Sequence, residues 1–366
     1  MELIFYPLTA VILIIILKDI FLLSRVPHFI SPPRNKLSTP FVSVFVAARN
    51  ESTTIRRCVE GLLDQDYPSK KYEILIGNDQ SEDDTMSVIS TIAKENPQVK
   101  SFDISELVVP ARGKMNVLVQ LISNAKGDYF LFTDADTKVG ISWISTLVNT
   151  LQSGYGVVTG TSVIRNDHFF QRFQNLDWIQ AQAMVKILED NGTRVTSLGN
   201  NMGVTKEAYE SVGGFHGIPF SITEDYELYI SIISNGYKPL HIFNRGALAE
   251  TLSMASFGAL LEQRKRWMFG VIRLPNSIIL FLLLNAIYVP VLILLLIVAP
   301  LTAIVVGIVR WVILSEFLKR VQKLINQKGS VLWLLPFEIY QSSVNLTSLI
   351  YYLLPIKARW KGRPFS

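Results

Sequence analysis

The sequence predicts an α/β domain that lies between apolar, membrane-spanning helices. Residues 40–270 alternate short apolar runs with amphipathic stretches, which is the pattern of βα units around a mostly parallel sheet. Both ends of the chain carry long apolar blocks instead, and the mean hydropathy of the 366 residues is +0.31. Charged residues make up 18% of the chain, against about 25% in an average soluble domain. These values exclude disordered, collagenous and fibrous proteins.

The charge balance and the cysteine content exclude further classes. The 35 Lys and Arg exceed the 30 Asp and Glu by a net charge of +5, which is small and spread along the chain, so no nucleic-acid partner is expected. The single cysteine, Cys58, cannot form an intrachain disulfide or a cysteine zinc site, and it fits a reducing compartment.

Residues 1–24 predict an N-terminal transmembrane anchor. Residues 3–23 are apolar except at Thr9, Lys18 and Asp19, and about 20 residues suffice for a helix to cross the hydrocarbon core. A cleaved signal peptide is the weaker alternative, because an acidic residue replaces a basic start and no small-residue cleavage site follows. Basic residues after the segment favour a next domain on the cytoplasmic face of the cell membrane, and these are Arg25, His28, Arg34 and Lys36.

A C-terminal membrane region of two to three helices is predicted over residues 276–356. Its first apolar block, residues 276–318, is too long for one span of about 17 to 25 residues, and Pro300 near its middle suits a turn between two helices. A third candidate covers residues 331–354 and contains Glu338. If all three segments crossed, the basic C-terminal tail would lie outside, against the positive-inside rule. One segment is therefore re-entrant or lies flat at the interface, and the sequence leaves open which one.

Three apolar runs in the central region predict strands that end in polar clusters. The runs are residues 41–48, 72–77 and 129–133, and the clusters that follow them are Arg49-Asn50-Glu51, Asn78-Asp79 and Asp134-Ala135-Asp136. In open α/β sheets, ligands bind outside the carboxyl ends of the strands, so we expect these clusters to form a site. Amphipathic helices are expected over residues 52–63, 84–94, 171–189 and 252–268.

Asp134 and Asp136 are the candidate metal ligands. On an extended chain just past a strand, their carboxylates lie on the same side, as a hard divalent cation that bridges phosphate oxygens requires. Taken alone, the triplet fits an exposed turn better, since carboxylates normally lie in solvent. Asp79, at the tip of another predicted strand, can accept a hydrogen bond from a nucleobase or a ribose.

Two motifs closer to the C-terminal membrane region complete the candidates. Thr223-Glu224-Asp225 offers an acidic pair, and its simpler interpretation is a helix start that Thr223 caps, with the acids favoured by the helix dipole. In Gln263-Arg264-Lys265-Arg266-Trp267, Arg266 would neutralise a diphosphate and Trp267 would pack on a sugar ring. A juxtamembrane basic anchor with an interfacial tryptophan is the alternative for this second motif.

In this order the motifs resemble those of the membrane-bound family 2 glycosyltransferases, the group of cellulose, chitin and hyaluronan synthases and ceramide glucosyltransferase. The resemblance covers about residues 40–270. The similar segments are Ala47-Ala48-Arg49-Asn50-Glu51, Gln65-Asp66-Tyr67-Pro68, Asn78 to Thr85, Gly113-Lys114 with Asn116, Asp134 to Asp136, Thr223-Glu224-Asp225 and Gln263 to Trp267. One departure is Asn78, which stands where the family usually has the first aspartate of a pair, while Asp79 matches the second.

The resemblance implies a GT-A fold, which is a Rossmann-like nucleotide-sugar-binding domain, and an inverting transfer from a nucleotide sugar, with a UDP-sugar as the expected donor. The nucleotide site that it implies consists of Ala48, Arg49, Asn50, Glu51, Asp79, Lys114 and Asp134. Asp134 and Asp136 would hold Mg²⁺ or Mn²⁺ on the diphosphate. Asp225 would be the general base, and the other implied catalytic residues are Glu224 and Arg266. The acceptor and diphosphate side would consist of Gln263, Arg266 and Trp267.

The acceptor is expected to be a membrane lipid or a lipid-linked glycan. A polymer-translocating synthase needs several helices with polar residues around a hydrated pore, and residues 278–284 and 291–298 contain no polar residue. Only the last segment has a polar face, which would guide an acceptor head group toward Asp225, and its residues are Glu338, Gln341, Ser342, Ser343 and Asn345. A processive polysaccharide synthase is the alternative, because such synthases share the motifs. A nucleotidyltransferase that makes an activated sugar is more remote, because no glycine-rich basic loop follows the first strand.

Overall fold

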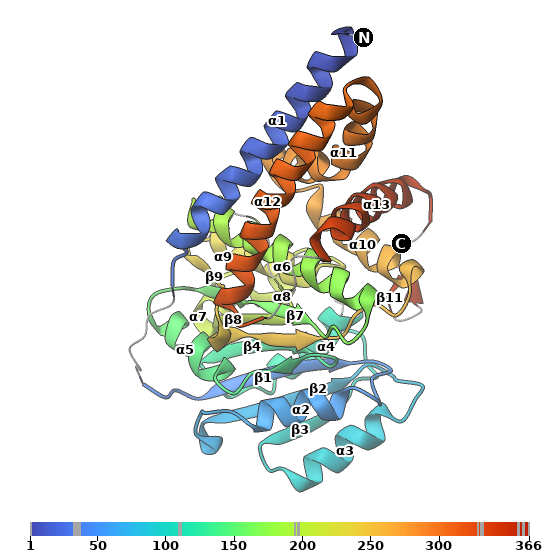
Figure 1. Ribbon diagram of the computed structural model, residues 1–366. Helices are drawn as coiled ribbons and strands as arrows, with labels where there is room; N and C mark the ends of the chain where they lie inside the picture. The colour runs from blue at the N-terminus through green and yellow to red at the C-terminus, as the bar shows by residue number, and fades with distance from the viewer. Residues whose placement is uncertain are drawn as a thin grey trace.

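The computed structural model describes residues 2–31, 38–108, 112–193, 195, 198–327, 329, 333–356, 359–360 and 363–364. Of the basic residues that favour a cytoplasmic domain, Arg34 and Lys36 lie outside these described residues. Figure 1 shows a layered α/β domain from which a group of long helices projects on one side.

Seven strands of the described chain form the central sheet of the domain, in the order β3-β2-β1-β4-β8-β6-β9. They are β1 (Val42–Ala48), β2 (Tyr72–Asn78), β3 (Val99–Asp103), β4 (Tyr129–Asp134), β6 (Val157–Gly160), β8 (Asn201–Thr205) and β9 (Pro239–Ile242). β8 runs antiparallel to both of its neighbours, and the other neighbouring strands are parallel. The α/β class and the mostly parallel sheet predicted from the sequence are confirmed.

Helices cover both faces of this sheet. One face packs on α2 (Ile55–Leu63), α3 (Thr85–Glu95) and α5 (Trp143–Gln152). The opposite face packs on α4 (Lys114–Ile122), α7 (Lys206–Ser211), α8 (Gly214–Gly217) and α9 (Glu224–Ser234). Side chains alternate between the faces, so Val44 belongs to the first core cluster and Phe45 to the second. The helix expected over residues 52–63 begins only at Ile55, whose amide makes the first helical hydrogen bond to the Glu51 carbonyl.

The other elements connect this layered domain to the projecting helices. A small sheet has the order β5-β10-β7, with β5 (Lys138–Val139), β10 (Ala249–Thr251) and β7 (Ser162–Ile164). The helix expected over residues 171–189 is α6 (Phe169–Asp190), and the one expected over residues 252–268 is α10 (Phe257–Val271). The second helix begins later than expected, because the Ser256 side chain caps it by accepting from the amide of Ala259. A two-stranded sheet joins β11 (Arg359–Trp360) to β12 (Arg363–Pro364). Short 3-10 helices are η1 (Val26–His28), η2 (Ser69–Lys71) and η3 (Arg245–Ala247).

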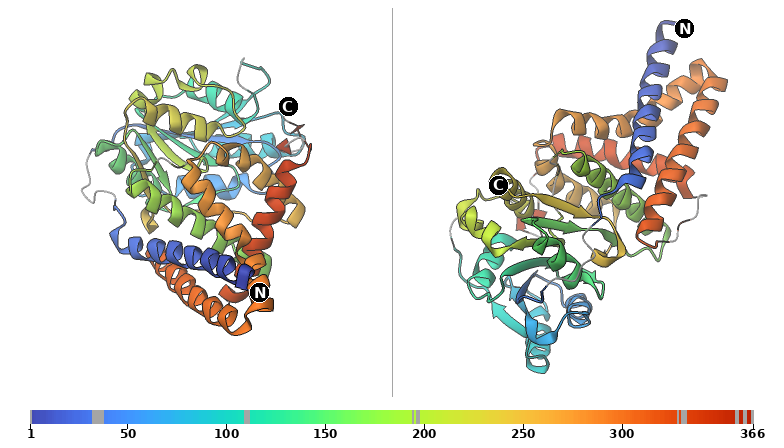
Figure 2. Two further views of the ribbon diagram at one scale, coloured as in Figure 1. Left: turned by 90° about the horizontal axis from the view of Figure 1, so that it is seen from above. Right: turned by 90° about the vertical axis from the view of Figure 1, so that its left-hand side faces the viewer.

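Three helices in the described part of the chain are long and apolar enough to cross a membrane. They are α1 (Glu2–Arg25), α11 (Asn276–Val298) and α12 (Pro300–Leu324). Ala299 alone separates α11 from α12, so the long C-terminal block divides at Pro300, as the sequence predicts. The three helices pack on one another, and Figure 1 and the right-hand view of Figure 2 show them extending away from the sheet.

The last long helix, α13 (Leu334–Leu353), is not one of the three membrane-length helices found among the described residues. It packs against α6, α10 and α11, and several of its polar side chains are buried there. The amide of Gln341 donates to Asp177 of α6 at 3.1 Å, and Ser342 donates to the carbonyl of Asn285 on α11 at 3.1 Å. The expectation that this face guides an acceptor head group is therefore wrong for Glu338, Gln341 and Ser342, which are buried in contacts within the protein, whereas Ser343 on the same helix is exposed.

Four buried charged residues join α1 to α12 and α13, and we call them the membrane cluster: Lys18, Asp19, Arg310 and Glu338. The Asp19 carboxylate lies 2.9 Å from Lys18 Nζ and 2.9 Å from Arg310 Nε. Arg310 Nη1 lies 3.4 Å from Glu338 Oε1, and Lys18 also donates to the side chain of Asn285 on α11. Charged residues within membrane segments normally pair in this way, away from lipid. The cluster explains how an apolar N-terminal helix accommodates adjacent lysine and aspartate residues.

Candidate active site

Strand register brings the predicted site residues to one edge of the central sheet. Ala48 pairs with Asn78 across β1 and β2, and Ala47 pairs with Asp134 across β1 and β4. The three loops that follow these parallel strands therefore leave the sheet at the same edge. In open α/β sheets this edge is the usual position of a ligand site.

Hydrogen bonds lock the loop after β1 to the loop after β2. The Arg49 guanidinium donates to the carbonyls of Asp79 (2.6 Å) and Gln80 (2.8 Å). The Asn50 side chain accepts from the amide of Glu82 at 2.9 Å. Asn50 and Gln80 have φ angles of 53° and 51°, in the left-handed region that asparagine tolerates better than most residues. These contacts determine the shape of the loops that were predicted to hold a nucleotide.

Asn78, the departure from the family pattern, has a partner on the neighbouring strand. Its side-chain amide donates to the carboxylate of Asp103, the last residue of β3, at 2.8 Å. An aspartate at position 78 would bring two carboxylates to hydrogen-bond distance, which is unfavourable unless one of them is protonated. Asparagine at position 78 therefore forms a hydrogen bond with Asp103 where an aspartate would be repelled.

Four charged residues gather where β4 ends and where α4 and α9 begin, and we call them the cleft cluster: Lys114, Asp134, Glu224 and Asp225. Lys114 Nζ lies 2.7 Å from Asp134 Oδ1 and 3.1 Å from Glu224 Oε1. Gly113, with a φ of 55°, lets the chain turn into α4 just before this lysine. Burial disfavours the charged form of Lys114, but the surrounding carboxylates, Asp134 first, outweigh burial and raise its pKa. Lys114 is therefore a cation at neutral pH.

Asp225 lies in the first turn of α9, where the helix dipole favours negative charge. This agrees with the predicted helix start, although the Thr223 side chain makes no capping hydrogen bond. The Asp225 carboxylate accepts a hydrogen bond from the amide of Gly199 at 2.7 Å. A Cβ at Gly199 would lie 2.7 Å from Asp225 Oδ2, so only glycine allows this close approach. The backbone at this glycine thus helps to hold the proposed base.

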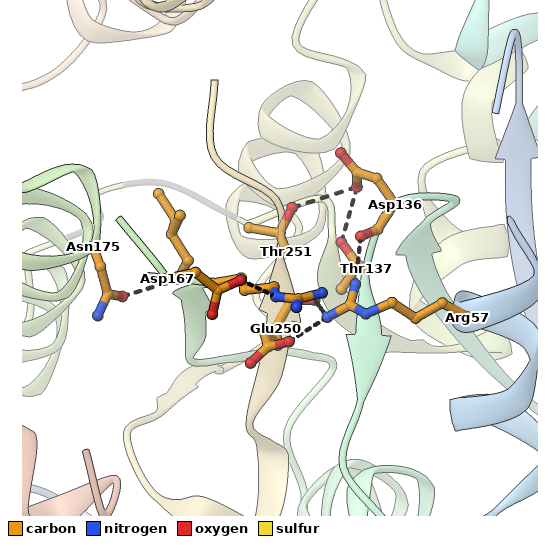
Figure 3. Close-up of polar contacts among 9 residues, drawn as sticks. Arg57, Asp136, Thr137, Asp167, Asn175, Glu250 and Thr251 are labelled. Atoms are coloured by element: carbon orange, nitrogen blue, oxygen red, sulfur yellow. Dashed lines mark hydrogen bonds and ion pairs between the residues drawn. The ribbon is translucent and has the colours of Figure 1, made fainter. Parts of the chain in front are cut away.

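Asp136 lies in a turn after β4. The extended backbone that was expected to carry both aspartates ends at Asp134, so this part of the expectation is wrong. The amide of Thr137 donates to the Asp134 carbonyl at 3.0 Å and closes this turn. Figure 3 shows the Asp136 carboxylate accepting hydrogen bonds from the hydroxyls of Thr137 (3.2 Å) and Thr251 (3.4 Å). Among the described residues, no group of three or more side chains suited to a metal is found. The carboxylates of Asp134 and Asp136 fit a site whose remaining ligands are substrate phosphates and water. Mg²⁺ usually has such a set of ligands.

The cationic helix α10 packs on α6 through aromatic and charged contacts. Trp267 stacks on Trp178 of α6 with ring centroids 4.8 Å apart. The Arg264 guanidinium lies 4.9 Å from the centroid of the Trp267 ring, and Arg264 also pairs with Asp177 of α6. The tryptophan that was predicted to pack on a sugar ring is therefore oriented by two neighbours within the protein.

A cavity of about 530 Å³ unites most of the predicted site residues. Those that line it are Arg49, Glu51, Lys114, Asp134, Asp136, Glu224, Asp225, Gln263, Arg266 and Trp267. Ala48 and Asp79 are buried behind this lining, and Asn50 is exposed outside it. Burial lowers the pKa of Arg266, and the nearby acids Glu262 and Asp134 oppose that effect. The arginine of α10 and the first candidate metal ligand thus face the same space.

Residues of α6 that the sequence analysis did not single out also line the cavity. They are spaced four apart and lie on one face of the helix, and they include Gln174, Trp178 and Gln182. Gln174 exchanges two hydrogen bonds, each 2.9 Å long, with the backbone of Met254. Polar and aromatic residues repeating every four positions were the signal available in the sequence.

The far end of the cavity is apolar and reaches one of the membrane-length helices. Ile278 and Leu282 of α11 line it there, together with Leu274. Met184 and Val185 of α6 complete this apolar end. One cavity therefore extends from the carboxylates after β4 to the start of a membrane-length helix.

Comparison with protein families agrees with the motifs. A family model described as "Glycosyltransferase like family 2" matches residues 39–270. The chain belongs to this glycosyltransferase family. The matched part of this glycosyltransferase contains the whole cleft cluster and residues 263–267 of α10.

Curated relatives of this glycosyltransferase are named for the synthesis of a glycolipid or of a polysaccharide. The β-monoglucosyldiacylglycerol synthase of Trichormus variabilis is 29% identical over 241 residues, which are 64% of this chain and 49% of the relative. The poly-β-1,6-N-acetyl-D-glucosamine synthase of Staphylococcus aureus is 29% identical over 236 residues, which are 63% of this chain and 54% of the relative. The chain spans about half the length of the curated relatives it matches.

A solved structure has the same fold along almost the whole chain. It is the mannosyltransferase PcManGT from Pyrobaculum calidifontis in complex with GDP-Man and Mn²⁺, with a TM-score of 0.58 over 96% of this chain and 98% of that chain. At 16% identity the likeness concerns the fold alone. Together with the family match, it confirms the GT-A fold that the resemblance implied.

Proposed function

We propose that this glycosyltransferase moves a sugar from a nucleotide sugar to a hydroxyl group of a membrane lipid or lipid-linked acceptor. The expected donor is a UDP-sugar, and the transfer inverts the anomeric carbon. The observation that carries the proposal is the cavity that begins at Asp134 and Asp136 and ends at Ile278 and Leu282. A charged donor and an amphiphilic acceptor need two such chemically different ends within one binding space.

The donor would lie against the edge of the sheet. Arg49 and Glu51 would face its nucleoside, while Asp79, locked behind them, would hold the loop in shape. Asp134 and Asp136 would hold Mg²⁺ or Mn²⁺, which neutralises charge on the diphosphate when bound.

Transfer would be an in-line displacement. Asp225 would take the proton of the acceptor hydroxyl while the oxygen forms its bond to the anomeric carbon. The bond from that carbon to the diphosphate breaks, and Lys114 and Arg266 would stabilise the negative charge on the leaving nucleoside diphosphate. Glu224 would act through Lys114, whose ammonium it holds beside the diphosphate position. Attack opposite the leaving group inverts the anomeric configuration.

The acceptor would approach from the bilayer. Its apolar part would lie along the apolar end of the cavity at Ile278 and Leu282, and its head group would reach Gln263 and Trp267. Trp267, which Trp178 and Arg264 orient, lines the cavity there and would give this head group an apolar contact.

We propose the same domain arrangement that the sequence predicts. Residues 1–24 would be the anchor, residues 40–270 the cytoplasmic catalytic domain, and residues 276–356 the C-terminal membrane region. Crossing by α11 and α12 alone returns the chain to the cytoplasmic side, and α13, with its buried polar contacts, would lie along the domain. This arrangement satisfies the positive-inside rule for the basic tail.

A donor panel tests the proposed function. Membranes that contain the protein are supplied with radiolabelled UDP-sugars and extracted with chloroform and methanol, with the Asp225→Asn variant as the control. Label that enters the organic phase with the wild type, and not with the variant, supports the proposal. Label found only in water-soluble, high-molecular-weight material would favour the processive polysaccharide synthase, as the name of the Staphylococcus aureus relative suggests.

A further inference from the structure

Arg57, in the first turn of α2, contacts two segments that are far apart in the sequence. Its Nη1 donates to the carbonyl of Asp136 at 3.1 Å, and its Nη2 donates to the carbonyl of Glu250 at 3.3 Å. The guanidinium also forms an ion pair with the Glu250 carboxylate. Figure 3 shows this side chain reaching from its helix to the turn after β4 and to the strand β10.

The strand that Arg57 holds carries a residue that contacts the Asp136 carboxylate. Thr251 follows Glu250 in β10, and its hydroxyl lies 3.4 Å from Asp136 Oδ1. β10 pairs with β5, which begins two residues after Asp136, so the turn and the strand belong to one small unit. Arg57 therefore fixes both the backbone of Asp136 and the strand that orients its carboxylate.

We propose that Arg57 is a positioning residue for the metal site, which it serves by holding Asp136 and Thr251 in register. The inference rests on the proposed function, because Asp136 is the second candidate metal ligand. Arg57 does not touch the reacting groups in this account. It acts through the orientation of one carboxylate, and partners of metal ligands are worth roughly 10- to 100-fold in metal affinity.

The direction in which cation binding changes when Arg57 is removed distinguishes a positioning role from a purely electrostatic one. If Arg57 mattered only through its charge, its removal would strengthen cation binding, because a positive charge near the carboxylates would be lost. If Arg57 positions Asp136, its removal weakens cation binding despite the same loss of charge. The neighbouring Arg56 is exposed on the same helix and supplies a matched control with an equal change of charge.

The test is Mn²⁺ binding to the purified full chain with UDP present, followed by electron paramagnetic resonance. We expect Arg57→Gln to weaken Mn²⁺ binding roughly 10-fold or more. Arg57→Lys keeps the charge but replaces the two nitrogens that donate to the two carbonyls by one nitrogen without the planar fork, so it should lose a similar factor. Arg56→Gln should bind like the wild type. Unchanged or tighter binding in Arg57→Gln would overturn the proposal, and so would wild-type binding in Arg57→Lys.

Two further measurements guard against a misfolded variant. Thr251→Val removes one hydroxyl contact without a change of charge, and it should weaken Mn²⁺ binding in the same direction but by a smaller factor. In Arg57→Gln the Mn²⁺ concentration for half-maximal transfer should rise, while the rate at saturating Mn²⁺ stays near wild type. A fallen rate with an unchanged Mn²⁺ requirement would indicate a structural role and overturn the inference.

Wild-type behaviour distinguishes the two proposals. A wild type that binds Mn²⁺ with UDP, combined with an unaffected Arg57→Gln, overturns the positioning role alone. A wild type that binds no Mn²⁺ with UDP overturns the proposed metal site and this inference with it.

Discussion

The cleft cluster and the membrane cluster contain similar charges in different surroundings. In the cleft cluster, Lys114 lies between two carboxylates, and in the membrane cluster Arg310 does the same. The side chain of Asp134 is 39% exposed and that of Lys114 is 19% exposed, whereas Arg310 and Asp19 are 2% and 3% exposed. The clusters therefore differ in access and resemble each other in pairing.

Access decides what each set of charges can do. Lys114 can exchange a carboxylate for a phosphate that enters the cavity, because one charged hydrogen bond then replaces another. Arg310 is enclosed by helices, and its carboxylate partners on α1 and α13 serve to satisfy a buried cation. Ion pairs of the same kind are thus expected to govern activity in the cleft and stability among the membrane-length helices.

The largest effect is expected on the chemistry of the cleft. Asp225→Asn should lower the transfer rate by roughly 10² to 10⁴, the usual contribution of a general base. UDP binding and the thermal midpoint should stay near wild type, because the amide oxygen can still accept from Gly199. The transfer rate is measured at saturating donor, and UDP binding is measured by calorimetry. Wild-type turnover in this variant would remove Asp225 from its assigned role.

The next largest effect is expected on stability, when the membrane cluster loses its arginine. Arg310→Met should lower the free energy of unfolding by roughly 3–5 kcal/mol, because it leaves buried Glu338 without its partner. Arg320→Met is the matched control on the same helix, since Arg320 pairs with Glu316 at the surface, where such pairs contribute about 0–1 kcal/mol. Thermal unfolding in detergent compares the two. If both variants lost the same stability, the distinction between buried and solvent-accessible ion pairs would be contradicted.

A smaller effect is expected when the cleft loses its lysine. Lys114→Met removes a charged hydrogen bond worth about 1.5–3 kcal/mol, so UDP should bind roughly 10- to 100-fold more weakly. Buried Glu224 then lacks its cation, and the double variant Lys114→Met/Glu224→Gln should recover the thermal midpoint. Calorimetry on both variants is the measurement. If the double variant also recovered UDP binding, Lys114 would serve only to neutralise Glu224.

The smallest effect is expected for Asp83, an exposed carboxylate, which can be compared with the carboxylates of the two clusters. Asp83 is only slightly buried, which raises its pKa, but hydrogen bonds from Thr85 and Ser52 outweigh this and lower the pKa to about 2. Ionised Asp83 therefore adds stability above its ordinary pKa of 3.8, and the contribution is lost as the pH falls toward about 2. The thermal midpoints of wild type and Asp83→Asn should differ slightly at neutral pH and converge in acid. A difference that is constant with pH would contradict this.

The composition of the cleft could be predicted largely from local patterns. The apolar run before Asp134 ends in charged residues, and parallel pairing brings such strand ends to one edge of the sheet. Trp178 and Arg57 could not be assigned in this way. Each belongs to an ordinary amphipathic helix. Arg57 reaches the site only because α2 packs beside β5, and Trp178 only because α6 lies beside α10.

The sequence by itself determined the α/β class, the division of the C-terminal apolar block at Pro300 and the side chains available for chemistry. These features depend on residue type and on periods of about 2 and 3.6 residues, which are local properties of the chain. Only the tertiary structure decided that the polar face of α13 is buried on α6 and that Asp19 meets Arg310, 291 positions away. A buried polar group needs a partner, and its partner is whichever group packing brings within reach in space.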